Sequence, residues 1–153
     1  MSLITPSVLK KAVSGKRILV DTNIIIYLTD SIPSYERLSH LLFEMIEKGD
    51  VLAVFSIISI AEVMQGPLRK GFCQDALDVK NYLMNFPNTS CQEITPEVLG
   101  HIGLDSKIDW AKLRTTDSLI IAPGLVNNVD LFVSNDHHFK KALSKNFILA
   151  FDT

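Results

Sequence analysis

The sequence places a carboxylate inside a strongly apolar segment. Asp21 directly follows the apolar residues Ile18–Val20, and a second apolar run resumes after Thr22 and Asn23. Burying an unpaired carboxylate costs several kcal/mol or shifts its pKa until the group is neutral. We therefore expect Asp21 to lie at an exposed edge of the fold, where it faces a partner or a cation.

Three further acids stand in comparable positions. Glu62 lies one or two turns beyond the apolar run Val51–Phe55, Asp136 directly follows Leu131–Asn135, and Asp117 lies in the first turn of an expected helix. Each acid alone has a plain structural explanation, because acids cap helices and favour their first turns. The repetition of this context, at strand ends and helix starts, indicates a shared chemical role.

The elements that must hold these acids alternate along the chain. Short apolar runs without polar alternation, at 17–20, 51–55 and 131–134, predict buried strands, and amphipathic segments between them predict helices. This alternation predicts an α/β fold, a three-layer α/β/α sandwich with a central, mainly parallel sheet. Such folds carry their sites at the carboxyl ends of the strands, so the four acids are expected to converge there.

Converging carboxylates define the chemistry to expect. Their repulsion must be relieved by proton sharing or by a cation, and hard oxygen ligands favour Mg²⁺ or Mn²⁺. A few carboxylates with open water positions are the usual arrangement for metal-assisted phosphodiester hydrolysis. Zinc is disfavoured, because no H-x-x-x-H pattern occurs and the adjacent His137 and His138 are expected to point in different directions. No serine-hydrolase elbow or phosphate-binding glycine motif occurs either.

Length and composition set the frame for this chemistry. The 153 residues predict a single domain over 1–153, with an extra N-terminal helix at about 5–15 that starts at Thr5-Pro6. The formal net charge of −2 excludes a global basic field, so contacts with nucleic acid need local patches. Cys73 and Cys91 lack metal-site spacing, and no signal peptide or membrane-spanning run occurs, so we expect a cytoplasmic protein.

Four segments of the chain together resemble the signature blocks of PIN domains. They are VDTNIIIYL, SIISIAEV, LRTTDSLIIA and LFVSNDHHF, which occur in the family's order between residues 18 and 139. The likeness extends to small prokaryotic PIN proteins, including VapC-like toxin ribonucleases. It implies the sandwich fold and a Mg²⁺- or Mn²⁺-dependent endoribonuclease, possibly the toxin of a toxin–antitoxin pair.

The resemblance also implies residue roles. The catalytic, metal-holding acids would be Asp21, Glu62, Asp117 and Asp136. The polar residues at the family's supporting positions would be Asn23, Ser56, Ser134 and Asn135. The substrate would be single-stranded or structured RNA, for which Arg114, Lys112 and Lys140 are the candidate basic contacts. An antitoxin protein and a homodimer are the other partners that the resemblance suggests.

One segment departs from the family pattern. Pro123-Gly124 interrupts the apolar run after Asp117 and predicts a kink or break in that helix. A disturbed site would leave a non-catalytic module that binds RNA or a protein, which is the first alternative. The second is an aspartyl-phosphate phosphatase with Asp21 as nucleophile. Asn23 stands where such enzymes need a second Asp, which disfavours this reading.

Overall fold

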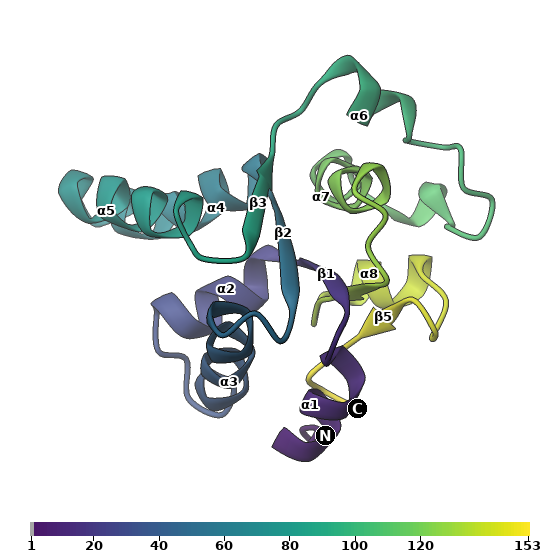
Figure 1. Ribbon diagram of the computed structural model, residues 1–153. Coiled ribbons are helices and arrows are strands. Elements are labelled where there is room, and N and C mark those ends of the chain that lie inside the picture. Colours follow the sequence, from purple (N-terminus) through teal and green to yellow (C-terminus); the bar gives the residue numbers. More distant parts are fainter. Residues whose placement is uncertain (1) are drawn as a thin grey trace.

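The computed structural model describes residues 2–153 and contains a five-stranded sheet whose neighbouring strands are all parallel. The strand order is β3-β2-β1-β4-β5, so the first strand lies in the centre of the sheet and the later strands are added on both sides of it (Figure 1). This confirms the predicted α/β fold with a parallel sheet. The strands are β1 (Arg17–Val20), β2 (Leu52–Ser56), β3 (Thr89–Gln92), β4 (Leu131–Val133) and β5 (Ile148–Leu149).

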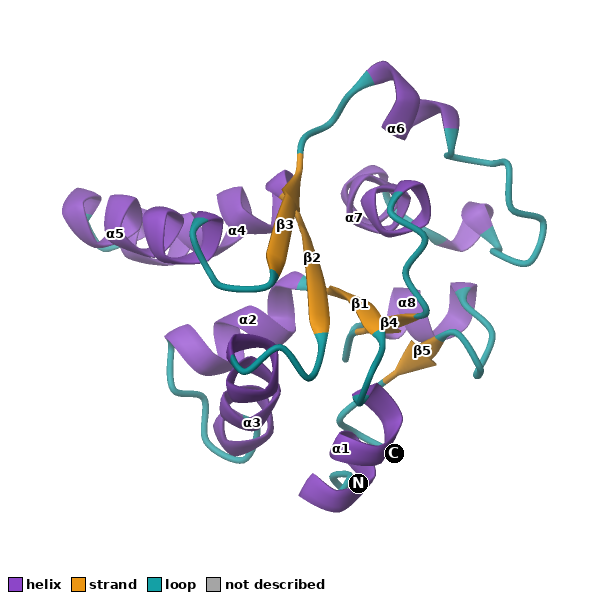
Figure 2. Cartoon of the chain, viewed as in Figure 1, coloured by secondary structure: helices purple, strands orange, loops and turns teal. Residues whose placement is uncertain are grey.

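Helices occupy both faces of this sheet (Figure 2). Thr5 caps the first of them by accepting a hydrogen bond from the N–H of Val8, and Pro6 stands in its first turn, as Thr-Pro favours. The helices are α1 (Pro6–Val13), α2 (Thr22–Thr29), α3 (Glu36–Glu47), α4 (Ile57–Arg69), α5 (Cys73–Met84), α6 (Pro96–Gly100), α7 (Thr115–Val126) and α8 (His137–Ala142), with a 3₁₀ turn at Trp110–Lys112.

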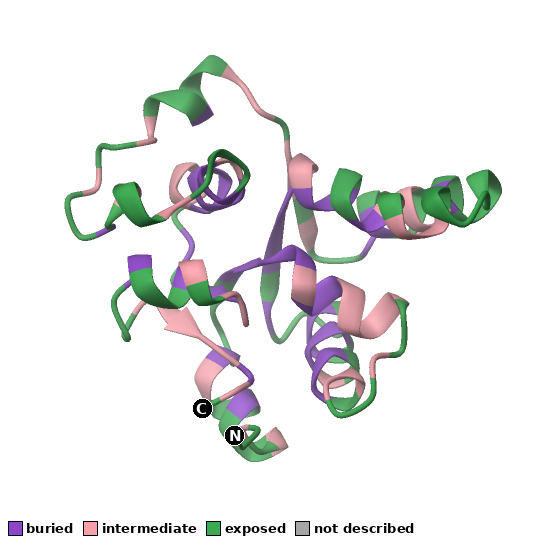
Figure 3. Cartoon of the chain, turned by 180° about the vertical axis from the view of Figure 1, so that it is seen from behind, coloured by how far each residue is buried: buried purple, intermediate pink, exposed green. Residues whose placement is uncertain are grey.

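Two hydrophobic cores follow from the pleat of the strands. Ile18 and Val20 of β1 join the core under α1 to α5, whereas Leu19 of β1 and Phe132 of β4 join the core under α7 and α8. Successive side chains of a strand point to opposite faces, so a strand buried on both faces is apolar throughout. Figure 3 shows the central strands buried and much of α5 and α6 exposed. No helix within residues 2–153 is long and apolar enough to span a membrane.

The sequence predicted a kink or a break at Pro123-Gly124, and a break does not occur, because α7 runs without interruption from Thr115 to Val126. Pro123 has no N–H to donate to the carbonyl of Leu119, one turn earlier. The hydroxyl of Ser56, at the end of β2, donates to that carbonyl instead, at 2.8 Å. A side chain from the neighbouring strand thus replaces the helical hydrogen bond that proline removes.

Gly124 brings α7 close to the sheet. A Cβ atom at this position would lie 2.6 Å from Cε1 of Phe132 in β4, which is closer than real Cβ contacts allow. The Pro-Gly pair therefore belongs to a tight contact between α7 and the sheet.

Candidate active site

Asp21 and Asp136 lie at the carboxyl ends of the neighbouring strands β1 and β4. Val20 pairs with Val133 in register, so the residues that follow the two strands come together. Each acid is also an N-cap. Asp21 accepts a hydrogen bond from the N–H of Thr22 at 2.7 Å, and Asp136 accepts one from the N–H of His138 at 2.7 Å. Capping therefore orients both carboxylates, as the plain structural explanation of these acids expects.

Ser134 joins these two acids. Its hydroxyl donates to Oδ2 of Asp21 at 2.6 Å and accepts a hydrogen bond from the N–H of Asp136 at 3.0 Å. Ser134 is fully buried, so both contacts are shielded from water. A short hydrogen bond from a buried hydroxyl to a carboxylate fixes the orientation of that carboxylate.

The expectation that Asp21 lies exposed at the edge is wrong, because only 4% of the residue is exposed. The pKa of Asp21 is raised to about 7, chiefly by burial, and the nearby charges of Asp136 and Glu62 contribute to this rise. The hydrogen bonds from Ser134 and from the N–H of Thr22 oppose this rise. The side chain lies under the surface because strand and helix pack around it, and hydrogen bonds from its neighbours compensate for the lost solvent.

Glu62 reaches the site through Thr22. The hydroxyl of Thr22 donates to Oε1 of Glu62 at 2.7 Å and lies 3.0 Å from the hydroxyl of the buried Ser59. The sequence prediction missed Thr22 and Ser59. Thr22 directly follows Asp21, and Ser59 and Glu62 are three residues apart on α4, a spacing that places them on one helix face.

Asp117 is buried, 2% exposed, and Arg114 engages both of its carboxylate oxygens. Nε of Arg114 donates to Oδ2 and Nη2 donates to Oδ1, each at 2.9 Å, and the backbone N–H of Arg114 also donates to Oδ2 at 3.0 Å. Burial raises the pKa of Asp117, but the hydrogen bonds and charge of Arg114 outweigh this and lower it. Asp117 is therefore held ionised.

Arg114 also contacts a second acid, because its Nη2 lies 3.5 Å from Oδ2 of Asp136. The contacts therefore run from Asp21 through Ser134 to Asp136, and through Arg114 to Asp117.

The other basic residues predicted to contact RNA lie on the surface. Lys112 pairs with Asp109 at 3.2 Å, and Lys140 is an exposed residue of α8.

Asn23 and Asn135 brace the loop after β4. Asn23 Oδ1 accepts a hydrogen bond from the N–H of Asn135 at 3.3 Å. The amide of Asn135 donates to the hydroxyl of Tyr27 at 3.1 Å and to Asp152 at 2.9 Å, and its oxygen accepts from the N–H groups of Phe151 and Asp152. The last residues of the chain thus support the loop that carries Asp136.

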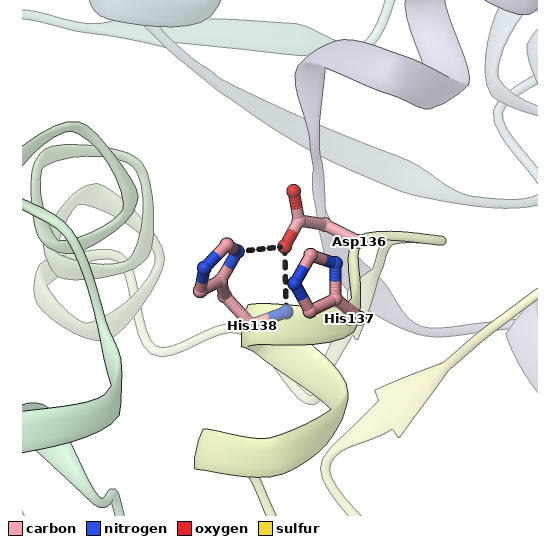
Figure 4. A group of neighbouring side chains, drawn as sticks. All are labelled: Asp136, His137 and His138. Carbon is pink, nitrogen blue, oxygen red and sulfur yellow. Dashed lines mark hydrogen bonds and ion pairs between the residues drawn. The ribbon is translucent and has the colours of Figure 1, made fainter.

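The expectation that His137 and His138 point in different directions is wrong. Their ring centroids are only 4.1 Å apart. Nδ1 of His138 lies 3.1 Å from Oδ1 of Asp136 (Figure 4). Within residues 2–153, Asp136, His137 and His138 form a group whose potential ligand atoms all lie within 4.8 Å of one another, and Asp21, Glu62 and Asp117 lie outside this group. Imidazole ligands suit zinc, copper, iron or nickel, whereas carboxylates suit Mg²⁺ and Mn²⁺.

The side chains around the carboxyl ends of β1 and β4 are of the chemical type that binds a divalent cation. They are carboxylates from four separate segments, with hydroxyls that orient them, and hard oxygen ligands of this kind suit Mg²⁺ and Mn²⁺. Burial is the main cause of the raised pKa of Asp21, and the negative charges of Asp136 and Glu62 add to it. A cation would offset these charges, as Arg114 already does for Asp117.

Comparison with protein families identifies the class. Residues 18–143 match the PIN domain, so the chain belongs to the PIN domain family, whose members are generally nucleases. This confirms the resemblance seen in the sequence. No curated protein matches the sequence.

Solved structures share the fold at low sequence identity. VapBC2 from Rickettsia felis, solved with a promoter DNA fragment, has a TM-score of 0.65 and 18% identity, covering 89% of this chain and 99% of that one. A toxin–antitoxin complex from Klebsiella pneumoniae has a TM-score of 0.59 and 17% identity, covering 87% and 95%. VapBC-1 from nontypeable Haemophilus influenzae has a TM-score of 0.54 and 17% identity, covering 86% and 98%. The similarity shows a common PIN fold over nearly the whole length of each chain.

Proposed function

We propose that this protein is a Mg²⁺- or Mn²⁺-dependent endoribonuclease. The observation that supports this most strongly is the chain of contacts that runs from Asp21 through Ser134, Asp136 and Arg114 to Asp117. It joins acids from three distant segments at one edge of a parallel sheet. Membership of the PIN family supplies the reaction class, hydrolysis of a phosphodiester bond.

The residues that would hold the cation are Asp21, Glu62, Asp117 and Asp136. A divalent cation there would neutralise charge on the phosphodiester and lower the pKa of a water molecule. Ser134 and the N–H of Thr22 hold Asp21 in one orientation, and the hydroxyl of Thr22 does the same for Glu62. Partners that orient metal ligands in this way typically affect metal affinity or activity by about 10–100-fold.

A proton must leave Asp21 before it can act as a ligand. Because burial raises the pKa of Asp21 to about 7, this group is partly protonated at neutral pH without a cation. A divalent cation held by Asp21 would require this group to be deprotonated. Asp117 needs no such step, because Arg114 lowers its pKa.

We further propose that the protein is the toxin of a toxin–antitoxin pair. The proteins with similar folds include a toxin–antitoxin complex and two VapBC assemblies. An antitoxin would hold the nuclease inactive until it is removed. The predicted homodimer and the cytoplasmic location remain predictions.

The direct test is cleavage of a labelled pool of single-stranded RNA with Mg²⁺, with Mn²⁺ and with a chelator. The wild type should cut only with metal. Asp21→Asn should lose at least about 100-fold, since even the partners of metal ligands are worth about 10–100-fold. Equal cleavage by the variant, or cleavage in chelator, would show that another activity is responsible.

A further inference from the structure

Arg114 forms ion pairs with two of the acids that we propose as metal ligands. Its guanidinium binds both oxygens of Asp117 at 2.9 Å and lies 3.5 Å from Oδ2 of Asp136. The Asp117 side chain is 3% exposed, whereas the Arg114 side chain is 57% exposed. The guanidinium therefore approaches Asp117 from the solvent side, the side from which a cation and RNA would enter.

A guanidinium in this position competes with a divalent cation. Both need carboxylate lone pairs, and the oxygens of Asp117 already accept three hydrogen bonds from Arg114. Two positive groups a few ångströms apart also repel each other. A cation that binds between Asp117 and Asp136 must therefore weaken or displace the contacts of Arg114.

We propose that Arg114 is an internal counter-ion that occupies the acidic site until a divalent cation replaces it. This inference rests on the proposed function, because it assumes that Asp117 and Asp136 bind the metal. Arg114 stabilises the metal-free site by compensating the buried charge of Asp117 and the partly buried charge of Asp136. It thereby lowers the affinity of the site for the metal.

Once displaced from Asp117, the Arg114 side chain could bind the substrate. Arg114 is half exposed and stands at the N-cap of α7, so it can swing outward without opening a core. A guanidinium at the rim of the site is well suited to bind a phosphate oxygen with two parallel hydrogen bonds. Metal binding would thus release a phosphate-binding group beside the bond to be cut.

The opposite role makes the opposite prediction. If Arg114 served mainly to orient Asp117 for the metal, its removal would loosen the ligand and weaken metal binding. If Arg114 is a competitor, its removal strengthens metal binding. The sign of the change in affinity therefore distinguishes the two roles without any measurement of cleavage.

The test is calorimetric titration of Mn²⁺ into the wild type, Arg114→Gln and Arg114→Lys. We expect R114Q to bind Mn²⁺ about tenfold more tightly, which is the scale of a partly exposed, charge-assisted contact. R114K keeps the charge but loses the fork, so its affinity should lie between the two. Lys107→Gln makes the same change in net charge at an exposed position and should stay within about twofold of the wild type.

The outcomes separate this inference from the proposed function. If Asp136→Asn abolishes Mn²⁺ binding while R114Q binds Mn²⁺ no more tightly than the wild type, the metal site stands and the role of Arg114 as competitor fails. If the wild type and R114Q both take up no Mn²⁺, the proposed function and this inference fail together. Circular dichroism checks the fold. If R114Q does not fold, tighter binding by R114K supports the proposal and unchanged or weaker binding overturns it.

Discussion

At the scale of single residues, the site holds two buried carboxylates whose pKa values are shifted in opposite directions. Burial raises the pKa of Asp21 to about 7, whereas Arg114 holds the pKa of Asp117 below its usual range. The difference lies in the partner, because Asp21 has only neutral hydrogen-bond donors and Asp117 has a guanidinium. Pairs of acids whose pKa values are pushed apart are typical of catalytic sites.

The raised pKa of Asp21 predicts how stability depends on pH in the absence of metal. An unfolded Asp loses its proton near pH 3.8, while the folded protein keeps it until about pH 7. The folded state therefore binds more protons in this window, and the free energy of unfolding falls as pH rises through it. The full loss is of the order of 4 kcal/mol, at about 1.4 kcal/mol per pKa unit.

Asp21→Asn removes this titration. In chelator at pH 8 the variant should therefore be more stable than the wild type by a few kcal/mol, and the advantage should shrink towards pH 4. Urea unfolding at several pH values measures the difference. A variant that is less stable than the wild type at pH 8 would mean that Asp21 is not a buried, destabilising charge.

At the scale of elements, the contact between β2 and α7 explains how a helix with an internal proline stays intact. The hydroxyl of Ser56 donates to the carbonyl of Leu119 and also accepts the N–H of Ile58 at the start of α4. One buried hydroxyl thus connects the helix that carries Glu62 to the helix that carries Asp117. Ser56 stabilises the site without touching its acids.

This account predicts a coupling between Ser56 and Pro123. Ser56→Ala should cost about 1–2 kcal/mol, because it leaves the carbonyl of Leu119 without its donor. Pro123→Ala restores a backbone N–H one turn after Leu119. Ser56→Ala should therefore cost clearly less in the Pro123→Ala background, as denaturant unfolding of the four proteins in a double-mutant cycle would show. Additive costs would contradict the replacement of the helical bond by Ser56.

The close approach of α7 to the sheet gives a second prediction at this scale. Gly124→Ala should destabilise the protein by about 1–3 kcal/mol, because its Cβ would collide with the ring of Phe132. Gly100→Ala in α6 is the matched control, since a Cβ there meets no atom within 4 Å. Thermal unfolding compares the two. Equal stability of both variants would argue against the tight contact.

Local sequence patterns were enough to predict the class of the fold and the position of two acids of the candidate site. Apolar runs identified the inner strands, and an acid after such a run marks the carboxyl end of a parallel strand, which is how Asp21 and Asp136 could be located. The continuity of α7 through Pro123 could not be predicted from local patterns. The hydroxyl that replaces the missing helical hydrogen bond belongs to Ser56, a residue 67 positions before Pro123. The same limit applies to the burial of Asp21 and to the pairing of Arg114 with Asp136, which depend on contacts between distant segments.

At the scale of the whole molecule, the topology assembles the site from the full length of the chain. The sheet starts at β1 in its centre and grows in both directions, so residues near positions 21, 62, 117 and 136 meet at one edge. Both ends of the chain lie close together, because Leu3 pairs with Asp152, whose side chain binds Asn135 (Figure 1). Because the protein has a net charge of −2 and an acidic site, the RNA binding that we propose would need local cations such as Arg114.

We propose above that these acids support metal-dependent hydrolysis of RNA. The most direct measurement is the end-group chemistry of RNA cut by the purified protein with Mn²⁺. Hydrolysis in which water attacks phosphorus and the 3′ oxygen leaves produces 5′-phosphate and 3′-hydroxyl ends, and these products should disappear in chelator and with Asp136→Asn. Products that end in a 2′,3′-cyclic phosphate, or that persist without metal, would contradict the account, because they arise from attack by the 2′-hydroxyl of RNA itself.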